Sequence, residues 1–293
     1  MASKSKISVL AEKIAWKGRQ KYSQFRCRMG GGKFVWKVDE KVQFVSYVGD
    51  PFSHVLFVCK GHEKVELNWC DRWLKLDQSA QSVIDCGANI GYFSAMLAQR
   101  CFLDKVLAIE GNRHTAKLCQ ATFDILNLQN SQVIEAILAE NSEEHYHISD
   151  KPGLEPWQNA VRVTPEASNI HTTTLDQVIL DSGVNPSLVK IDCEGSETLI
   201  LKGANYTLES LRPAFMIECN DTALETAGTN RKELFGLLRK NHYKLFHLAS
   251  FTGFYPFGLE VQDNFPSSEF NFAAIPNDHA NVARWTNSAN ADS

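Results

Sequence analysis

Residues 82–94 constrain the fold of this chain more than any other stretch. The apolar, β-branched pair at 83–84 predicts a strand buried inside an α/β sheet. Gly87 permits a sharp turn after that strand, and Gly91 permits a ligand or the strand to approach the start of a helix closely. Asp85 stands near the carboxyl end of the strand, where open α/β sheets bind their ligands. The stretch therefore predicts a strand, a turn and a helix at a ligand-binding edge.

Strand-like and helix-like segments alternate after this stretch, which predicts a doubly wound, mostly parallel sheet of seven strands. A polar excursion at 140–172 interrupts the alternation, with short strands expected at 145–148 and 161–163. The main strands are expected at 83–86, 105–110, 132–136, 188–192, 214–218, 244–248 and 270–275. The helices between them are expected at 91–100, 113–126, 175–181, 197–211 and 231–240.

The N-terminal residues 1–78 predict a separate appendage of one helix and a small antiparallel β-sheet. Its helix is expected at 6–19, and its strands are expected at 34–38, 42–48 and 55–60. The α/β domain then occupies 79–285, and 286–293 form a polar tail.

The composition argues against a membrane-spanning or disulfide-built protein. The 293 residues are 44% hydrophobic and 22% charged, as in ordinary soluble domains. No apolar run is long enough to span a bilayer, and the N-terminus lacks the apolar core of a signal peptide. The eight cysteines form no CxxC pair, which indicates reduced thiols and a cytoplasmic protein.

Positive charge gathers at the N-terminus. Residues 1–37 hold ten Lys and Arg against one acid, Glu12. Since the whole chain has a net charge of −4, the remainder carries −13. This basic arm is either a solvated helix or a segment that meets an acidic partner, a membrane surface or transit machinery. We expect no nucleic-acid partner, and the sequence leaves the oligomeric state open.

Three predicted strands end in an acid followed by a cysteine, at Asp85, Asp192 and Glu218. If these strands are neighbours, the acids face one crevice. Glu110 ends another strand and could accept hydrogen bonds from ribose hydroxyls, or it could cap the helix that follows. Asn89 stands where a dinucleotide-binding turn would have its second glycine, which argues for a cofactor without a pyrophosphate. S-adenosylmethionine is such a cofactor.

Two motifs carry a family resemblance. Val83–Gly91, VIDCGANIG, resembles the first motif of class I S-adenosylmethionine-dependent methyltransferases. Val189–Glu197, VKIDCEGSE, followed by LKGA at Leu201–Ala204, resembles the signature of the FkbM-type methyltransferases. The resemblance extends from about Glu66 to Ile275 and includes four smaller matches: Thr174–Asp176, Arg212–Pro213, Ile217–Glu218 and Asn127.

The resemblance implies a Rossmann-like sheet whose last strand is antiparallel, and methylation of a hydroxyl oxygen on a natural product, sugar or glycolipid. Gly111 departs from the proline usual in the family, and the first 65 residues match no family pattern. The implied cofactor-binding residues are Asp85, Gly87, Ala88, Asn89, Gly91 and Tyr92 around the methionine end, Glu110 and Gly111 at the ribose, and Asn112, Glu135 and Ala136 by the adenine, with Asp192 beside them.

Methyl transfer to a hydroxyl needs an aligned acceptor and a group that takes its proton. Asp192 is the first candidate for that base, with Glu194 and Glu197 behind it and Glu218 completing the wall. Structural alternatives remain for two of them: Glu194 could only shape its turn, and Glu197 could only complement a helix dipole. Carboxylates could also hold Mg²⁺, although we expect no metal because no ligand spacing supports one.

Other functions and acceptor contacts remain open at this point. A nicotinamide-dependent oxidoreductase and a non-catalytic binding module are the alternatives to a methyltransferase. His54 and His62 are expected to be packing or surface residues in an appendage that could cover the crevice. Aromatic residues before the last strand could wall an acceptor or only pack a hairpin: Phe251, Phe254, Tyr255 and Phe257.

Overall fold

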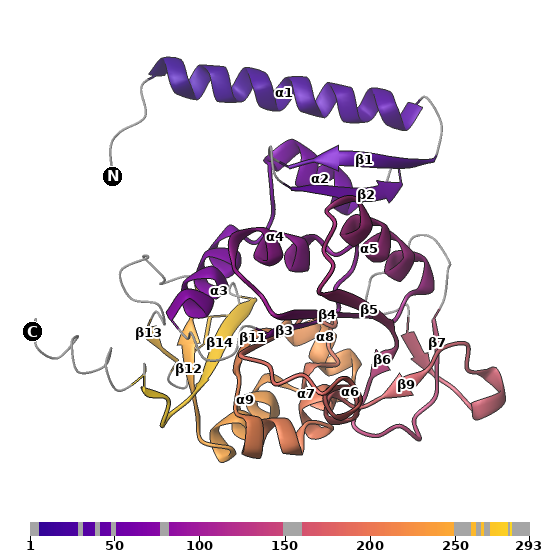
Figure 1. Cartoon of the computed structure of the whole chain (residues 1–293), viewed down its shortest axis with the longest axis vertical. Coiled ribbons are helices and arrows are strands. Elements are labelled where there is room, and N and C mark those ends of the chain that lie inside the picture. Colours follow the sequence, from indigo (N-terminus) through magenta and orange to yellow (C-terminus); the bar gives the residue numbers. More distant parts are fainter. Residues whose placement is uncertain are drawn as a thin grey trace, which may run out of the picture.

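The computed structural model describes residues 6–28, 32–38, 42–47, 51–76, 82–148, 160–248, 259–261, 265–266, 270–280 and 282. The predicted aromatic loop at 251–257 and the polar tail at 286–293 lie outside these residues. In the part that is described, helices cover both faces of one central sheet (Figure 1).

The central sheet has the strand order β13-β12-β14-β11-β10-β3-β4-β5. The pairs from β11 through β10, β3 and β4 to β5 are parallel, whereas β14 runs antiparallel to both β11 and β12. The predicted seven-stranded sheet with an antiparallel last strand is thus confirmed, and β13 adds a two-residue edge strand. The bounds are β3 Ser82–Cys86, β4 Lys105–Glu110, β5 Ser131–Glu135, β10 Leu188–Ile191, β11 Ala214–Glu218, β12 Tyr243–His247, β13 Leu259–Glu260 and β14 Asn271–Pro276.

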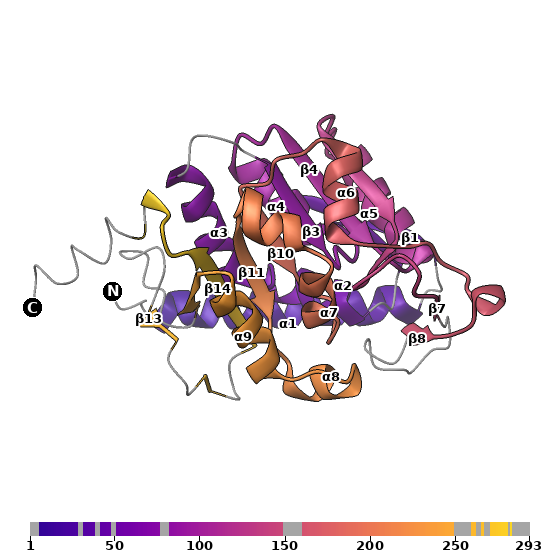
Figure 2. The ribbon, with the colours of Figure 1, turned by 90° about the horizontal axis from the view of Figure 1, so that it is seen from below.

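Successive residues of a strand point to opposite faces of the sheet and pack in two hydrophobic clusters, one on each face. Val83 packs in a cluster with Trp73 and Phe93, whereas the next residue, Ile84, packs with Leu175 on the other face. The first face is covered by α3 (Lys64–Leu76), α4 (Tyr92–Arg100) and α5 (Arg113–Ile125). The second is covered by α6 (Leu175–Ser182), α7 (Glu197–Lys202) and α9 (Arg231–Lys240), which lie in front when seen from below (Figure 2).

The N-terminal segment contains α1 (Lys6–Arg28), the antiparallel pair β1 (Lys33–Lys37) and β2 (Gln43–Tyr47), and α2 (Pro51–Cys59). The predicted strand at 55–60 is wrong, because residues 55–59 belong to α2 and residue 60 is in the turn after it. A short apolar run does not distinguish a buried strand from a helix, and Pro51 suits the first position of a helix. Helix α3 was not predicted; it shares its hydrophobic cluster with Trp36 of β1 and with the sheet.

The predicted helix at 197–211 is divided into α7 and a π-helical turn, η3 (Thr207–Leu211). The carboxylate of Asp176 caps the start of η3, because it accepts hydrogen bonds from the amides of Tyr206 and Thr207 at 2.7 and 2.9 Å. Helix α8 (Asp221–Thr226) was also not predicted. The excursion contains the expected pair of short strands, β7 (Tyr146–Ile148) and β8 (Ala160–Arg162), and its ends pair as β6 (Ile137–Leu138) and β9 (Thr172–Thr173). Among the described residues, no helix is both long and apolar enough to cross a membrane.

Candidate functional site

A cavity of about 990 Å³ opens at the carboxyl ends of β3, β4, β10 and β11. This is the edge at which the sequence predicts a crevice. The predicted site residues that line it are Gly87, Ala88, Asn89, Tyr92, Glu110, Gly111, Asn112, Ala136, Asp192, Glu194 and Glu218. The predicted residues that do not line it are Asp85, Gly91, Glu135 and Glu197.

The turn after β3 is fixed against both neighbouring strands. The amides of Gly87 and Ala88 donate to the carbonyl oxygen of Ile109 in β4, at 2.9 and 3.1 Å. Gly87 has φ +78°, and a Cβ there would lie 1.9 Å from the carbonyl oxygen of Asp192 after β10. Glycine is required at this position because the backbones of the two strand ends approach so closely.

Glu110 is tied to the turn and to the next helix. Its carboxylate accepts hydrogen bonds from the amides of Asn89 and Asn112, both at 2.8 Å. The residue that caps α5 is Asn112, whose side chain accepts from the amides of His114 and Thr115. Burial raises the pKa of Glu110, and the two amide hydrogen bonds oppose that rise. The carboxylate is therefore held at the cavity wall, with lone pairs left for a ligand.

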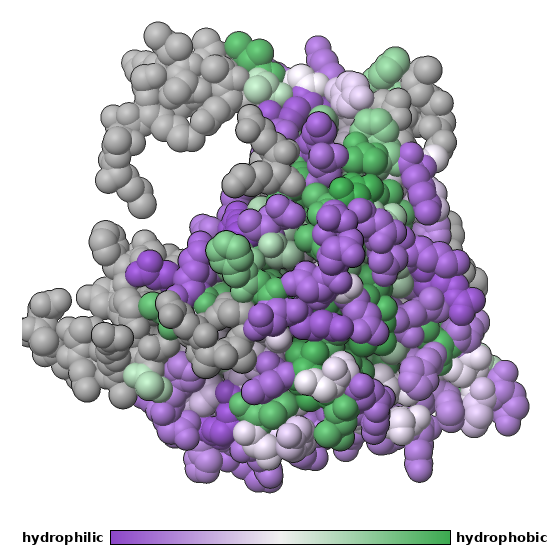
Figure 3. Space-filling view, viewed as in Figure 1, coloured by the Kyte–Doolittle hydropathy of each residue, from purple (hydrophilic) through white to green (hydrophobic). Residues whose placement is uncertain are grey.

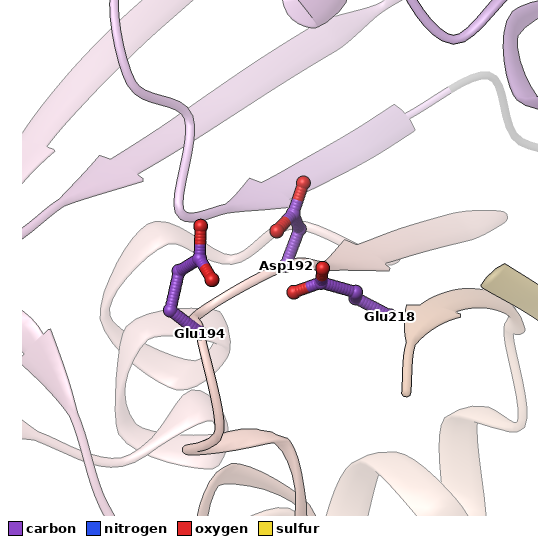
Figure 4. Close-up of side chains that lie close together, drawn as sticks. All are labelled: Asp192, Glu194 and Glu218. Carbon is purple, nitrogen blue, oxygen red and sulfur yellow. The ribbon is translucent and has the colours of Figure 1, made fainter. Parts of the chain in front are cut away.

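The acids that follow β10 and the acid that ends β11 converge. One carboxylate oxygen from each of Asp192, Glu194 and Glu218 lies within 4.8 Å of the others, and the three side chains turn toward one another (Figure 4). Burial, and then the neighbouring Asp192, raises the pKa of Glu218 to about 10. Glu218 is therefore protonated at neutral pH and shares a hydrogen bond with Asp192. These oxygens could hold a divalent cation, but an acidic cluster alone does not identify a metal site.

Lys190 lies beneath these acids. Its ammonium nitrogen is 2.7 Å from Oδ2 of Asp192 and 3.9 Å from Oδ1 of Asp85, and its side chain is 4% exposed. Burial would lower the pKa of Lys190, but the carboxylates of Asp192, Glu63 and Asp85 outweigh burial and raise it. Burial would raise the pKa of Asp192. The charge and hydrogen bond of Lys190 oppose burial, and the pKa of Asp192 lies below its ordinary value. Asp192 is thus held ionised.

Three predicted residues have structural partners instead of a place in the cavity wall. Asp85 is fully buried and accepts a hydrogen bond from Ser94 Oγ at 2.7 Å. Glu197 accepts from the amides of Cys193 and Gly195 at 2.9 and 3.1 Å, and so stabilises the turn before its own helix. Glu135 pairs with Arg113 at 2.7 Å on the exposed side of β5. For Glu197 this geometry favours the structural alternative.

The N-terminal segment supplies part of the cavity wall, as the sequence allowed, but through residues that the sequence did not single out as site residues. Phe52, His62 and Glu63 line the cavity, and the hydroxyl of Tyr92 accepts a hydrogen bond from the amide of His62 at 3.2 Å. His54, by contrast, lies 2.7 Å from the hydroxyl of Ser23 and packs α1 onto α2, as expected of a packing residue. No local motif marks residues 62–63, because their place depends on contacts far along the chain.

Comparison with protein-family profiles matches residues 85–245 to the methyltransferase FkbM domain. No curated protein sequence matches the chain. Among solved structures, methyltransferase FkbM from Methylobacillus flagellatus KT is 21% identical, with a TM-score of 0.42; the match covers 67% of this chain and 43% of that one. The chain thus spans less than half the length of that protein.

Two further solved structures are similar at lower identity. The O-methyltransferase from Bacillus cereus in complex with SAH is 12% identical, with a TM-score of 0.41, and the match covers 73% of this chain and 82% of that one. TYW2 from M. jannaschii in complex with AdoMet is 15% identical, with a TM-score of 0.39, and the match covers 83% and 84%. Since the FkbM domain profile spans more than half of the chain, this protein belongs to the FkbM methyltransferase domain family.

Proposed function

We propose that this protein transfers a methyl group from S-adenosylmethionine to a hydroxyl oxygen of a small molecule, sugar or glycolipid. One observation carries the proposal: the turn after β3, the carboxylate of Glu110, the acids that follow β10 and the acid that ends β11 line one cavity in a chain of the FkbM family. At about 990 Å³, that cavity has the size of a site for a cofactor together with part of an acceptor.

The residues of the cavity fit the cofactor. Gly87 lets the turn lie close to the end of β10, Asn89 ties it to Glu110, and the turn lines the cavity where the methionine end would lie. Glu110, already held by two amides, would accept the ribose hydroxyls through its remaining lone pairs. Asn112 and Ala136 would flank the adenine. Asp85 and Gly91 would support the site without contacting the cofactor. Asp85 holds Ser94 of α4, and Gly91 allows the start of α4 to approach Cys119 of α5 closely.

S-adenosylmethionine, when bound, supplies a sulfonium methyl group that a nucleophile can displace. The chain must hold the acceptor oxygen in line with the breaking bond and exclude water. Asp192, ionised beside Lys190, would position the acceptor by accepting a hydrogen bond from a polar group other than the hydroxyl that is methylated. Glu218, protonated beside Asp192, and Glu194 would complete that wall.

Calorimetry with S-adenosylhomocysteine tests the proposal. The wild-type protein should bind it, and Glu110→Ala should bind it at least about tenfold more weakly, since the loss of a charge-assisted hydrogen bond costs about 1.5–3 kcal/mol. Glu209→Gln is the matched control, because Glu209 is an exposed acid outside the cavity. A folded wild-type protein that fails to bind S-adenosylhomocysteine contradicts the proposal, and tight NADH binding would favour an oxidoreductase.

We also propose that α1 contacts an anionic membrane surface. The helix meets the body through polar groups: Nε of Arg19 donates to the carbonyl oxygen of Val58 at 2.9 Å, and Ser23 lies 2.7 Å from His54. The apolar Ile14 and Phe25, three helical turns apart on another face, are 63% and 55% exposed. Hydrophobic side chains accordingly appear over α1 beside hydrophilic ones (Figure 3).

An apolar outer face inside a segment rich in lysine is the pattern of helices that lie in a membrane interface. Cosedimentation should show binding to vesicles with phosphatidylglycerol, weaker binding to pure phosphatidylcholine, and release by salt. The double substitution Ile14→Ser and Phe25→Ser should weaken binding, whereas Phe102→Ser, at a residue 99% exposed outside α1, should not. Equal binding by the double variant would contradict this contact, and a dimer lost only in the double variant would make α1 a self-association surface.

A further inference from the structure

The cavity needs a group that takes the proton of an acceptor hydroxyl, and most of its acids are unsuited to that task. Asp192 is held ionised by Lys190 and is a weak base. Glu218 is already protonated at neutral pH. Glu110 is engaged by two backbone amides at the cofactor end. The other acids that line the cavity are Glu140, Glu194 and, in the N-terminal segment, Glu63, and it is Glu63 whose surroundings suit a base.

Glu63 stands in a loop whose backbone is held in unusual conformations. Lys60, Gly61 and Glu63 have φ values of +57°, +112° and +47°. A left-handed backbone costs a residue such as Lys or Glu roughly 1–2 kcal/mol, and such strain gathers at functional sites. The loop is closed by the amide of Gly61, which donates to the carbonyl oxygen of Leu56 at 3.0 Å, and α3 begins directly after Glu63.

Tyr92 anchors this loop to the turn after β3. Its hydroxyl accepts from the amide of His62 at 3.2 Å, and its ring meets that of Phe52 edge-on at 6.4 Å. A Cβ on Gly61 would lie 2.8 Å from the Tyr92 hydroxyl, so the loop and the first residue of α4 are in tight contact. The position of Glu63 is thereby coupled to the same turn that we assign to the cofactor.

The side chain of Glu63 is 17% exposed and interacts electrostatically with Lys190 and Asp192, which also line the cavity. Burial raises its pKa to about 7; Lys190 opposes the rise, and Asp192, Glu66 and Asp85 add to it. Two further titratable neighbours are His62, whose Nδ1 lies 3.9 Å from the Glu63 carboxylate, and the buried thiol of Cys70 on α3. A carboxylate of this kind accepts protons far better near neutral pH than one at its ordinary pKa.

Resting on the proposed function, we propose that Glu63 is the general base of the methyl transfer, supplied to the cavity by the N-terminal segment. The acceptor oxygen forms its bond to the methyl carbon while the sulfur–methyl bond breaks and its electron pair stays on sulfur. The proton of the hydroxyl moves to the carboxylate of Glu63, which becomes a neutral acid. The products are the methyl ether and S-adenosylhomocysteine, and the proton later passes to solvent.

The test separates this inference from the proposed function by measuring binding and transfer independently. S-adenosylhomocysteine binding is measured by calorimetry, and transfer is measured with tritium-labelled S-adenosylmethionine and a total lipid and polar extract of the source cells. Three full-length variants are compared: Glu63→Gln, His62→Gln and Glu209→Gln. Glu209 is the control, because it is an exposed acid that neither lines the cavity nor acts on the pKa of Glu63.

Glu63→Gln should bind S-adenosylhomocysteine like the wild type yet transfer label at least about 100-fold more slowly, with the acidic limb of the rate–pH profile removed. Glu209→Gln should retain transfer. Wild-type transfer in Glu63→Gln overturns the inference, and loss in His62→Gln with retention in Glu63→Gln assigns the base to His62 instead. Absence of S-adenosylhomocysteine binding by the wild type would count against the proposed function itself.

Discussion

Replacing Lys190 with methionine is expected to destabilise the fold by about 3–5 kcal/mol, because it leaves buried carboxylates without their cation. Methionine fills a similar volume, so the change removes charge more than packing. The carboxylates affected are Asp85, which is fully buried, and Asp192, which lies 2.7 Å from the ammonium. Urea unfolding followed by circular dichroism measures the loss.

The loss should depend on pH with a definite sign. In the wild type, Lys190 lowers the pKa of Asp192, so this pair stabilises the fold above the ordinary pKa of aspartate and the stabilisation is lost in acid. In Lys190→Met, the lysine no longer opposes burial, the largest influence on Asp85 and Asp192, so their pKa values rise and the variant loses stability as pH rises. The gap between the two proteins should therefore widen between pH 5 and pH 8.

A matched variant distinguishes the loss of a buried lysine charge from the loss of an exposed one. Lys244→Met removes a lysine from the same sheet, where its ion pair with Glu260 at 3.3 Å is 34% and 41% exposed. Exposed pairs of this kind contribute at most about 1 kcal/mol, so this variant should unfold almost like the wild type. Equal destabilisation of Lys190→Met at both pH values would contradict the charge explanation and indicate lost packing.

The cofactor half of the site could be predicted from the sequence because it follows from local rules. Parallel strands that alternate with helices must end at one edge of a sheet, so Glu110, Asp192 and Glu218 could be brought together by strand order alone. The same rule wrongly predicts that the side chain of Asp85 lines the cavity. Asp85 is the residue before the last of β3, and its side chain points into the protein toward Ser94. Distinguishing the two faces of a fully buried strand needs the structure.

The other half of the site could not be predicted, because it depends on packing between distant segments. The apolar run at 55–60 has no clear period, and the structure resolves it as a helix that leads into the loop of Glu63. Glu63 meets the cavity only because α3 packs on the sheet face near β3. Lys190 could have predicted part of this arrangement from the sequence. It lies inside a strand that is otherwise apolar and buried on both faces, and a buried lysine requires acidic side chains nearby.

Gly87→Ala is expected to abolish S-adenosylhomocysteine binding, and it has the largest effect predicted for the turn itself. Two costs add at this residue. Its φ of +78° is left-handed, which costs alanine about 1–2 kcal/mol. The new Cβ would also lie 1.9 Å from the carbonyl oxygen of Asp192 and 2.8 Å from its carbonyl carbon. Backbone atoms cannot swing aside as a flexible side chain would, so the turn must separate from β10.

Gly183→Ala separates the cost of a left-handed backbone from the cost of a steric clash. Gly183 caps α6 at φ +63°, and nothing lies within 4 Å of the position of its Cβ, so this variant carries the strain of the left-handed backbone without a clash. It should fold, with somewhat lower stability, and bind S-adenosylhomocysteine normally in calorimetry. Wild-type binding by Gly87→Ala would show that the ends of β3 and β10 can separate without harm. Because Asp192 follows β10, that result would also remove the reason for placing Asp192 beside the cofactor.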